Sequence, residues 1–350
     1  MAVTNYEQID TTNDITTTRT LLHESIPLTG TIVSGTYGDF PNDDNIKNYS
    51  HGQFQSVYDY PYLSSSANHI FDITVGYDED SNLSGSALGS TQESKKINMY
   101  NQMSQVLLGY TGSTNKVRKF ESDLLLDGVN PMKEVLFMNF SRLITKDQIK
   151  KGTFSVTLGT GSWANPFGAK VVLTDSVATD VQGTTNTLGG DYGVLFESTA
   201  TSTVPHGLVF YQAGIVVLSA SVFNNPIDFL RDNADIYTVA AALTGSAITG
   251  SANALRHRVQ NISFNNTTEI NSSIYFCRVP HNKYNHSSNP TYLSSSTIRV
   301  KSVNSDQPIS YITTIGLYSS DNELLAVAKL SEPLRKDPTN ELTLRVRLDY

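Results

Sequence analysis

Three consecutive carboxylates, Asp78, Glu79 and Asp80, are the first group in the sequence that could do chemistry. A pair of carboxylic acids hydrolyses glycosidic bonds when their surroundings make one an acid and the other a base. These three residues follow an expected strand, 68–77, and open a polar loop, 78–94, that offers no apolar wall to separate their roles. We therefore expect solvated loop carboxylates without a catalytic role.

The same segment, DEDSN at 78–82, resembles the opening of a calcium-binding loop, with oxygen donors at alternating positions. Such a loop needs glycine at its sixth position and a bidentate glutamate at its twelfth. Leu83 and Gly89 stand there instead. We expect no calcium site.

The one cysteine, Cys277, forms a C-x3-H-x4-H pattern with His281 and His286. Zinc would need a fourth ligand and usually a second cysteine. The surrounding run, 270–279, is typical of a strand, in which Cys277 packs as a small hydrophobe without the cations that activate a thiol. We expect neither a metal site nor a cysteine nucleophile, and a single cysteine excludes an internal disulfide.

His257 lies between Arg256 and Arg258 and makes a small basic spot. The chain as a whole carries 25 Lys+Arg against 33 Asp+Glu, a net charge of −8. A generic nucleic-acid binder is therefore not expected, and the basic spot is predicted to meet an acidic neighbour instead.

Aromatic residues in the segment 278–296 could stack sugars or contact a partner protein. Asn289 and Pro290 predict a rigid turn that presents Tyr284 and Tyr292, and tyrosine offers a large contact area at low entropic cost. We favour subunit contact and take Tyr284, Asn289, Pro290 and Tyr292 as candidate interface residues.

Catalytic and nucleotide-binding motifs are missing from the sequence: there is no GxSxG, HExxH or Walker loop, and no GxGxxG after a strand. We expect no enzyme, no cofactor and no bound metal. The start, MAVTNYEQID, lacks the regions of a secretion signal, and no run approaches 18 apolar residues, so we expect no membrane partner.

The elements that carry these residues are predicted to be mostly strands. Ser and Thr number 39 and 37, and 18 Tyr and 14 Phe accompany them, a mixture that favours strands and turns. The fold class is therefore α+β, predominantly antiparallel β, with an extended N-terminal arm. Helices are expected at 95–110, 226–244 and 251–261. Strands are expected at 68–77, 153–158, 169–174, 193–198, 207–211, 214–223, 270–279, 296–303, 309–319, 323–330 and 341–350.

Two of these segments carry detailed predictions. The run 207–220 predicts a hairpin whose turn ends at Gly214, and 319–322 predicts a second one. The run 133–152 suits either one helix or a strand, EVLFMNF, followed by a short helix, TKDQIKK, capped by Thr145. We favour the second interpretation.

The chain is expected to comprise four regions. Residues 1–30 form the arm, either a free terminus or a strand that pairs with a neighbouring subunit. Residues 31–157 begin the α+β core, 158–225 form a β-rich inserted domain, and 226–350 supply helices and then antiparallel strands. In the last strand Leu342, Leu344, Val346 and Leu348 should face one side, opposite Thr343, Arg345, Arg347 and Asp349.

Six phrases resemble virion structural proteins of tailed bacteriophages, especially contractile-tailed phages of aquatic hosts. They are KKINMYNQMSQVLLG, MNFSRLITKDQIKKGTFSVTLG, GLVFYQAGIVVLS, KYNHSSNPTY, PISYITTIGLYSSDNELLAVAKLSEPLRKD and LRVRLDY. The resemblance covers about 68–222 and 270–350.

This resemblance implies a structural subunit that joins neighbouring proteins in the baseplate or tail, with a neck, collar or head-decorating position as the alternative. Expected partners are other phage structural proteins and copies of itself in a symmetric assembly, made in the host cytoplasm and carried in the virion. Residues 1–94 hold 2 basic and 13 acidic residues, a charge split that would permit electrostatic complementarity between subunits. A carbohydrate-binding adhesin that recognises the host is the alternative from another class.

Overall fold

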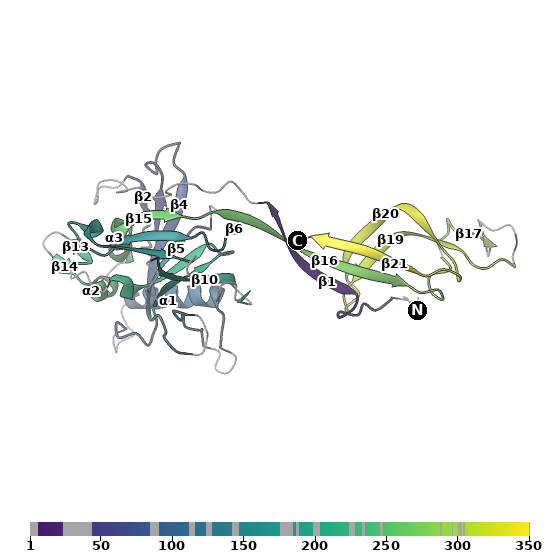
Figure 1. The fold of residues 1–350 in the computed structure, drawn as a ribbon, viewed down its shortest axis with the longest axis horizontal. Coiled ribbons are helices and arrows are strands. Elements are labelled where there is room, and N and C mark those ends of the chain that lie inside the picture. Colours follow the sequence, from purple (N-terminus) through teal and green to yellow (C-terminus); the bar gives the residue numbers. More distant parts are fainter. Residues whose placement is uncertain are drawn as a thin grey trace. The chain divides into compact units, whose positions relative to one another are not determined.

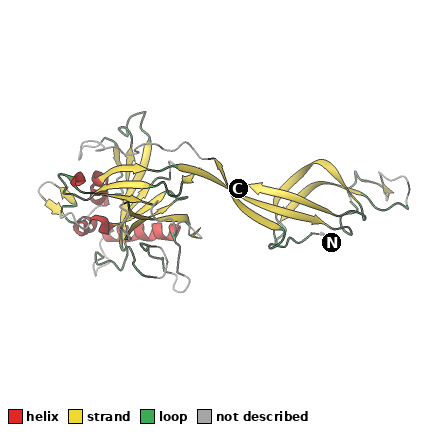
Figure 2. Cartoon of the chain, in the orientation of Figure 1, coloured by secondary structure: helices red, strands yellow, loops and turns green. Residues whose placement is uncertain are grey.

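Antiparallel β-sheet dominates the computed structural model of the protein (Figure 1), and helices accompany it (Figure 2), three of them α-helices in the part of the chain that the structure describes. The predicted α+β class is thereby confirmed. The structure describes residues 6–23, 44–84, 91–111, 116–123, 128–141, 147–175, 185–186, 189–198, 204–223, 228–232, 235–245, 248–287, 289–295, 297–299, 303 and 305–349.

The chain divides into two compact units. Unit 1 combines Met1–Leu22 with Glu269–Tyr350, and unit 2 is His23–Thr268. The expected regions 31–157, 158–225 and 226–350 divide the chain elsewhere, because sheet pairing crosses their boundaries.

An eleven-stranded antiparallel sheet forms the centre of unit 2. In spatial order its strands are β15 (Val259–Ser263), β7 (Ser155–Gly159), β8 (Lys170–Thr174), β10 (Gly190–Glu197), β11 (Pro205–Phe210), β12 (Ile215–Ser219), β5 (Glu134–Asn139), β4 (His69–Tyr77), β3 (Gln55–Tyr58) and β2 (Ile46–Asn48), with β9 (Thr185–Asn186) beside β10. The expected inserted domain is therefore wrong: β12 pairs with β5 and β7 pairs with β15, so 158–225 is built into the common sheet.

Continuous apolar runs in the central strands follow from burial on both faces of this sheet. In β5, Leu136 and Met138 join one hydrophobic cluster, while Val135 and Phe137 join another. Successive strand residues point to opposite faces, so a strand buried on both sides needs apolar residues at every position. The preference for a strand at EVLFMNF is confirmed.

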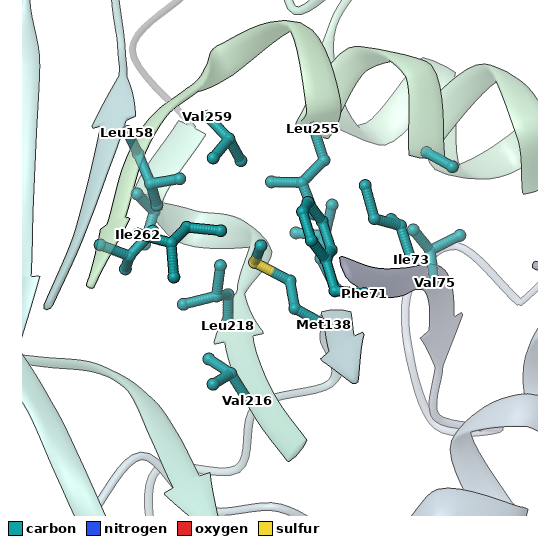
Figure 3. Packing of buried hydrophobic residues seen from close by; sticks show 14 of the residues in the cluster. Phe71, Ile73, Val75, Met138, Leu158, Val216, Leu218, Leu255, Val259 and Ile262 are labelled. Atoms are coloured by element: carbon teal, nitrogen blue, oxygen red, sulfur yellow. The ribbon is translucent and has the colours of Figure 1, made fainter. Parts of the chain in front are cut away.

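Helices cover both faces of this sheet. α3 (Ile248–Arg258) places Leu255 in the cluster that contains Phe71 and Met138 (Figure 3). α1 (Thr91–Leu107) packs against β4 and contributes Tyr100 to the second cluster. Full burial of each such side chain contributes about 1.5–3 kcal/mol. The predicted helix at 95–110 is confirmed.

The other two predicted helices differ from the structure. In the described part of 226–244, β13 (Leu230–Asp232) and β14 (Asp235–Tyr237) form a hairpin. Helix α2 (Val239–Thr244) begins only after Thr238, whose hydroxyl accepts the N–H of Ala241 and caps the helix.

The segment predicted as a helix at 251–261 changes to strand after Arg258, because Val259 and Ile262 are buried within the sheet. The predicted helix at 145–151 is also wrong where it is described: Gln148–Ile149 is strand β6, which pairs with residues 266–267. Thr145 lies outside the described residues.

The sheet of unit 1 is built from β1 (Ile15–His23), β16 (Asn266–Val279) and β21 (Leu342–Asp349), hydrogen-bonded in the order β1-β16-β21. The last residue of β1 and the first three of β16 belong to unit 2. Part of the segment expected as an arm thus adds a strand to β16 of its own chain. Residues 1–5 and 24–30 of that segment lie outside the described residues. Beside this sheet, β19 (Ser310–Tyr318) and β20 (Leu324–Lys336) form a separate hairpin, and β17 (Leu293–Ser294) and β18 (Thr297–Ile298) form a short one.

Both detailed hairpin predictions are confirmed. β11 and β12 pair around Gly214, which has a φ of 65°. β19 and β20 pair around a turn in which Asn322 has a φ of 63° and the Ser319 hydroxyl accepts the N–H groups of Asp321 and Glu323. β21 alternates as predicted, with Val346 buried, Leu342, Leu344 and Leu348 half-buried, and the residues between them exposed.

Arg258 and its neighbours face the interior of unit 2, which corrects the expected basic surface spot. The Arg258 guanidinium is fully buried and donates to the carbonyls of Phe229, Gly159, Gly161 and Asp228 at 2.7–3.3 Å. Burial lowers its pKa to about 10, so the group stays charged at neutral pH.

The two residues that precede Arg258 also have partners inside unit 2. Arg256 donates to Gln55 and Asn253, and a ring nitrogen of His257 lies 3.1 Å from the Trp163 carbonyl oxygen. The three residues that form a basic cluster in the sequence thus all make contacts inside unit 2.

Arg258→Lys is expected to lower the free energy of unfolding by about 2–4 kcal/mol, because one ammonium cannot reach all four carbonyls and leaves buried acceptors unpaired. Urea unfolding followed by circular dichroism measures this. The exposed Arg231 on β13 supplies the control, since Arg231→Lys should change stability by less than about 0.5 kcal/mol. Equal midpoints for the two variants would contradict the assignment.

Gly76 of β4 lets α1 approach the sheet. A Cβ there would lie 2.8 Å from the Lys96 carbonyl oxygen and 2.9 Å from the Tyr100 nitrogen, both of them helix backbone atoms. Gly76→Ala is therefore expected to cost about 1–3 kcal/mol of unfolding free energy, since the whole helix must shift.

Gly250→Ala is the matched control for Gly76→Ala. In α3 the nearest atom to an added Cβ is a Leu230 methyl at 3.4 Å, an ordinary contact. Alanine also has the higher helix propensity, so this variant should gain up to about 1 kcal/mol. Loss of stability at position 250 equal to that at position 76 would refute the close-approach argument.

Candidate interaction cleft

The described residues of unit 1 form no hydrophobic core like that of unit 2. Among the described residues of unit 1, the buried apolar side chains are Val279, Leu317 and Val346 alone. Both hydrophobic clusters belong entirely to unit 2. Since a β-sheet is stable only when it buries an apolar face, the sheets of unit 1 are under-buried in the isolated chain.

A cleft of about 1120 Å³ lies within unit 1, and we call it the unit 1 cleft. It is bordered by the N-terminal segment 6–14, by residues 276–279 of β16 and by residues 310–320 of β19 and the following turn. Half-buried side chains that would otherwise form a core, including Phe276, Ile315 and Leu344, line it. The missing core and the cleft are therefore one feature.

Four tyrosine rings surround the unit 1 cleft. Tyr6, Tyr284, Tyr311 and Tyr318 are 45%, 37%, 47% and 45% exposed, so each ring has area available for contact. The rings of Tyr6 and Tyr318 lie 5.0 Å apart between centroids, although the two residues are more than 300 positions apart in the chain. Exposed tyrosine rings gathered around one concavity are typical of recognition surfaces.

Charges beside the cleft are paired. Glu7 lies 2.5 Å from the Lys283 ammonium, and Asp14 lies 2.7 Å from the Arg278 guanidinium. The Asp14 carbonyl also accepts the N–H of Phe276, which holds the N-terminal segment against β16. The cleft therefore has a mostly neutral lining, and an occupant needs no strong charge of its own.

Lys336 organises the loop that carries Tyr284. Its ammonium is fully buried and donates to the carbonyls of His281 and Asp337 and to the side-chain oxygen of Asn285, at 3.2, 2.9 and 2.7 Å. The Ser310 hydroxyl donates to the Tyr284 carbonyl, and Tyr284 itself has a φ of 58°. Tyr284 is thus held beside the cleft by β19 and β20.

Of the four candidate interface residues, Tyr284 borders the cleft. Asn289, Pro290 and Tyr292 lie outside its lining and form the expected turn: the Asn289 side chain accepts the backbone N–H of Thr291, and its carbonyl accepts the N–H of Tyr292 at 2.9 Å. Burial raises the pKa of Tyr292 above its usual value. The predicted turn is confirmed, but Tyr292 is not brought to the site with Tyr284.

The other aromatic residues of the site were missed by sequence reasoning. Tyr6 lies in a segment without apolar periodicity. Tyr311 and Tyr318 lie in a strand whose hairpin partner the sequence predicts, but the sequence does not show which of its side chains are exposed. Their convergence depends on long-range pairing.

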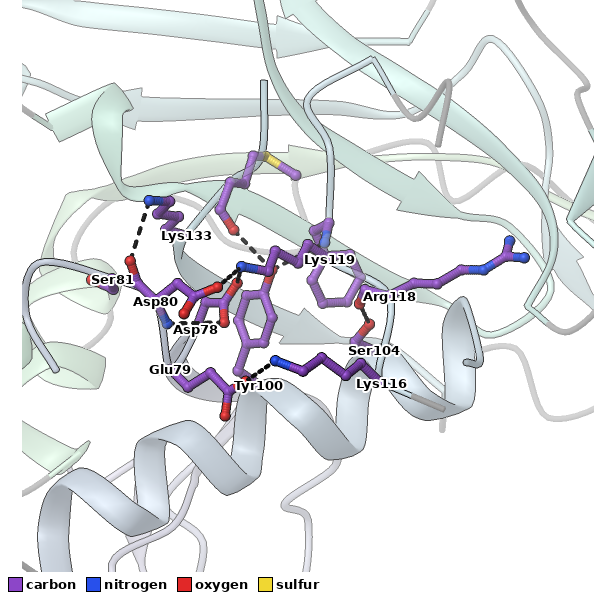
Figure 4. Close-up of polar contacts among 12 residues, drawn as sticks. Asp78, Glu79, Asp80, Ser81, Tyr100, Ser104, Lys116, Arg118, Lys119 and Lys133 are labelled. Atoms are coloured by element: carbon purple, nitrogen blue, oxygen red, sulfur yellow. Dashed lines mark hydrogen bonds and ion pairs between the residues drawn. The ribbon is translucent and has the colours of Figure 1, made fainter. Parts of the chain in front are cut away.

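The carboxylates Asp78, Glu79 and Asp80 are ion-paired, which partly corrects the expectation of solvated groups (Figure 4). Asp78 is buried and lies 2.9 Å from the Lys119 ammonium, which also contacts Asp80. Glu79 and Asp80 are exposed, as expected. The hydrogen bond and positive charge of Lys119 lower the pKa of Asp80, which keeps that carboxylate ionised.

Cys277, His281 and His286 do not converge on a metal site: within the described ranges, no group of three His, Cys, Asp or Glu side chains could hold an ion. Cys277 borders the cleft, and burial, together with the Asp14 carboxylate, raises the pKa of its thiol. A raised pKa keeps the thiol protonated and weakly nucleophilic. No helix in the described part of the chain is long and apolar enough to cross a membrane.

No family model, curated protein or solved structure matches the chain.

Lys336→Met should release the Tyr284 loop, because methionine matches the stem of lysine but cannot donate to the three oxygen atoms. We expect amide hydrogen exchange at residues 281–285 to accelerate and unit 1 to lose about 1–3 kcal/mol of stability. Exchange mass spectrometry on the full chain measures both.

Lys329→Met on the exposed side of β20 is the control for Lys336→Met, and it should leave exchange at 281–285 unchanged. If the two variants exchanged equally slowly there, Lys336 would not be the organising group.

Proposed function

We propose that this protein is a non-enzymatic structural subunit of a bacteriophage particle, located in the baseplate or tail, that joins neighbouring proteins through unit 1. A neck, collar or head-decorating position is the alternative within the same class. The phage assignment comes from the resemblance of the quoted segments, and the joining role from the surface of unit 1.

The observation that carries the proposal is the missing core of unit 1. Across the β19–β20 pair, Tyr318 lies opposite Leu324 and Gly316 lies opposite Val327, so Tyr318, Leu324 and Val327 share one face of the hairpin. All three are about half exposed, and the adjacent Leu325 is 67% exposed. An isolated two-stranded hairpin is marginally stable in water, and an exposed apolar face marks a contact site. Burial against a neighbour would supply the missing stabilisation.

A carbohydrate-binding adhesin is the second candidate, favoured by the four tyrosines around the cleft. Aromatic faces stack on sugar rings, and the hydroxyl-rich loops supply hydrogen-bonding groups. Binding of the purified chain to a glycan array, lost on Tyr318→Ala, would favour this candidate over a joining role.

Val327→Asp is expected to exclude the chain from assembled particles, since it places a carboxylate on the exposed apolar face without removing a buried side chain. Thr343→Asp, at an exposed position of β21, should be incorporated normally. Mass spectrometry of particles purified from cells that supply each variant measures incorporation, and electron cryomicroscopy locates the wild-type chain.

Several copies around the tail axis would support the proposal for the baseplate or tail. Absence of the wild-type chain from purified particles, or normal incorporation of Val327→Asp, would contradict it.

A further inference from the structure

The unpaired edge of β19 is the feature of the unit 1 cleft that points to a kind of occupant. β19 pairs with β20 on one side, and within the described residues no other strand pairs with it. Each of its nine residues borders the cleft, so the backbone itself lies along the opening. At about 3.4 Å per residue this edge is about 30 Å long.

β16, which also borders the cleft, has fewer unpaired backbone groups than β19 for an added strand to bond. β16 is paired with β21 over Ser272–Val279. On its other edge, the last backbone hydrogen bond to the N-terminal segment in the described residues is from Phe276 to Asp14. Cys277, Arg278 and Val279 follow that bond and border the cleft. An occupant would therefore hydrogen-bond chiefly to β19 and pack its side chains against β16.

We infer that the unit 1 cleft receives an extended segment of a partner protein, which adds to the free edge of β19 as an antiparallel or parallel strand and completes the core of unit 1. This inference rests on the proposed joining function and names its mechanism. Strand addition supplies main-chain hydrogen bonds, and alternate side chains of the added strand enter the pockets beside it.

Three properties of the cleft favour a peptide over other ligands. Its volume of about 1120 Å³ exceeds the roughly 300–1,000 Å³ of small-molecule sites. Its lining mixes polar residues with the half-buried apolar side chains of Phe276, Ile315 and Leu344, which suits a segment with an apolar residue at every second position. Its charges are paired, which disfavours an acidic glycan or a nucleotide.

An interruption in the β19–β20 pairing supplies a selective test. Pairing passes from Ile312 with Leu334 to Thr314 with Lys329, so Thr313 on β19 and residues 330–333 on β20 have no opposite residue. Thr313→Pro removes one edge N–H and places a ring where an added strand must lie, and proline is poorly tolerated inside a sheet. Thr313→Ala keeps the N–H and is the matched control.

The probe is a library of random dodecapeptides displayed on filamentous phage and selected against the full-length chain. We expect enrichment of peptides with apolar residues at alternating positions and new hydrogen-exchange protection along β19 when a selected synthetic peptide is added. Fluorescence anisotropy should show affinity weakened about tenfold or more by Thr313→Pro and changed less than about twofold by Thr313→Ala.

Tyr311→Lys is the second variant, because a charge at a strand edge opposes strand addition without changing the backbone. Tyr311 is exposed at the cleft, and Thr343→Lys on β21 is its control. Weaker peptide binding by Tyr311→Lys alone would support the inference even if Thr313→Pro failed to fold.

Several results would overturn the inference: no enriched peptides, equal binding by wild type and Tyr311→Lys, or glycans that protect the cleft when peptides do not. Protection of β19 that rises with the concentration of the chain alone would show a second copy as the occupant and would overturn the choice of a foreign segment. These failures differ from failure of the joining function, which is judged by incorporation into particles.

Discussion

Burial of apolar surface is the constraint on which the two units depend, and they satisfy it differently. In unit 2 the eleven-stranded sheet is covered on both faces, and its central strands therefore need apolar residues at consecutive positions. Side chains of α3 belong to one of the two hydrophobic clusters and side chains of α1 to the other. In unit 1 the strands are as long, but their apolar residues are spaced and half exposed. The same β-forming composition thus produces a finished core in one unit and an open cleft in the other.

Buried cations hold the connections between elements in both units, and they do so through backbone oxygen atoms. Lys96 of α1 donates to the carbonyls of Leu243 and Gly245 at the C-terminus of α2, where the helix dipole favours a positive charge. Arg258 likewise donates to four backbone carbonyls, and Lys336 donates to two carbonyls and to the side-chain oxygen of Asn285. Because a carbonyl is neutral, each such site keeps a net charge in the interior, and it is tolerable only while every donor is satisfied.

Local patterns in the sequence predicted local structure well. Gly214 and the 319–322 turn marked hairpins because a tight turn needs particular residues at particular positions. The alternation of apolar and polar residues over 342–349 predicted one half-buried face, because successive residues of a strand point to opposite sides. The helix predicted at 226–244 failed because a short hairpin and a cap at Thr238 compete with helix periodicity over the same residues. The insertion predicted at 158–225 failed because strand composition does not reveal which strands pair.

The sequence by itself determined the β-rich class, the turns and the α1 helix, since these depend on residues close together in the chain. Tertiary structure alone decided that Arg258 lies inside, that Asp78 is paired with Lys119, and that Tyr6 meets Tyr318 beside an open strand edge. Each of these contacts joins residues far apart in the chain, and their free energy depends on burial. Burial is a property of the folded arrangement of the strands, which composition and periodicity do not encode.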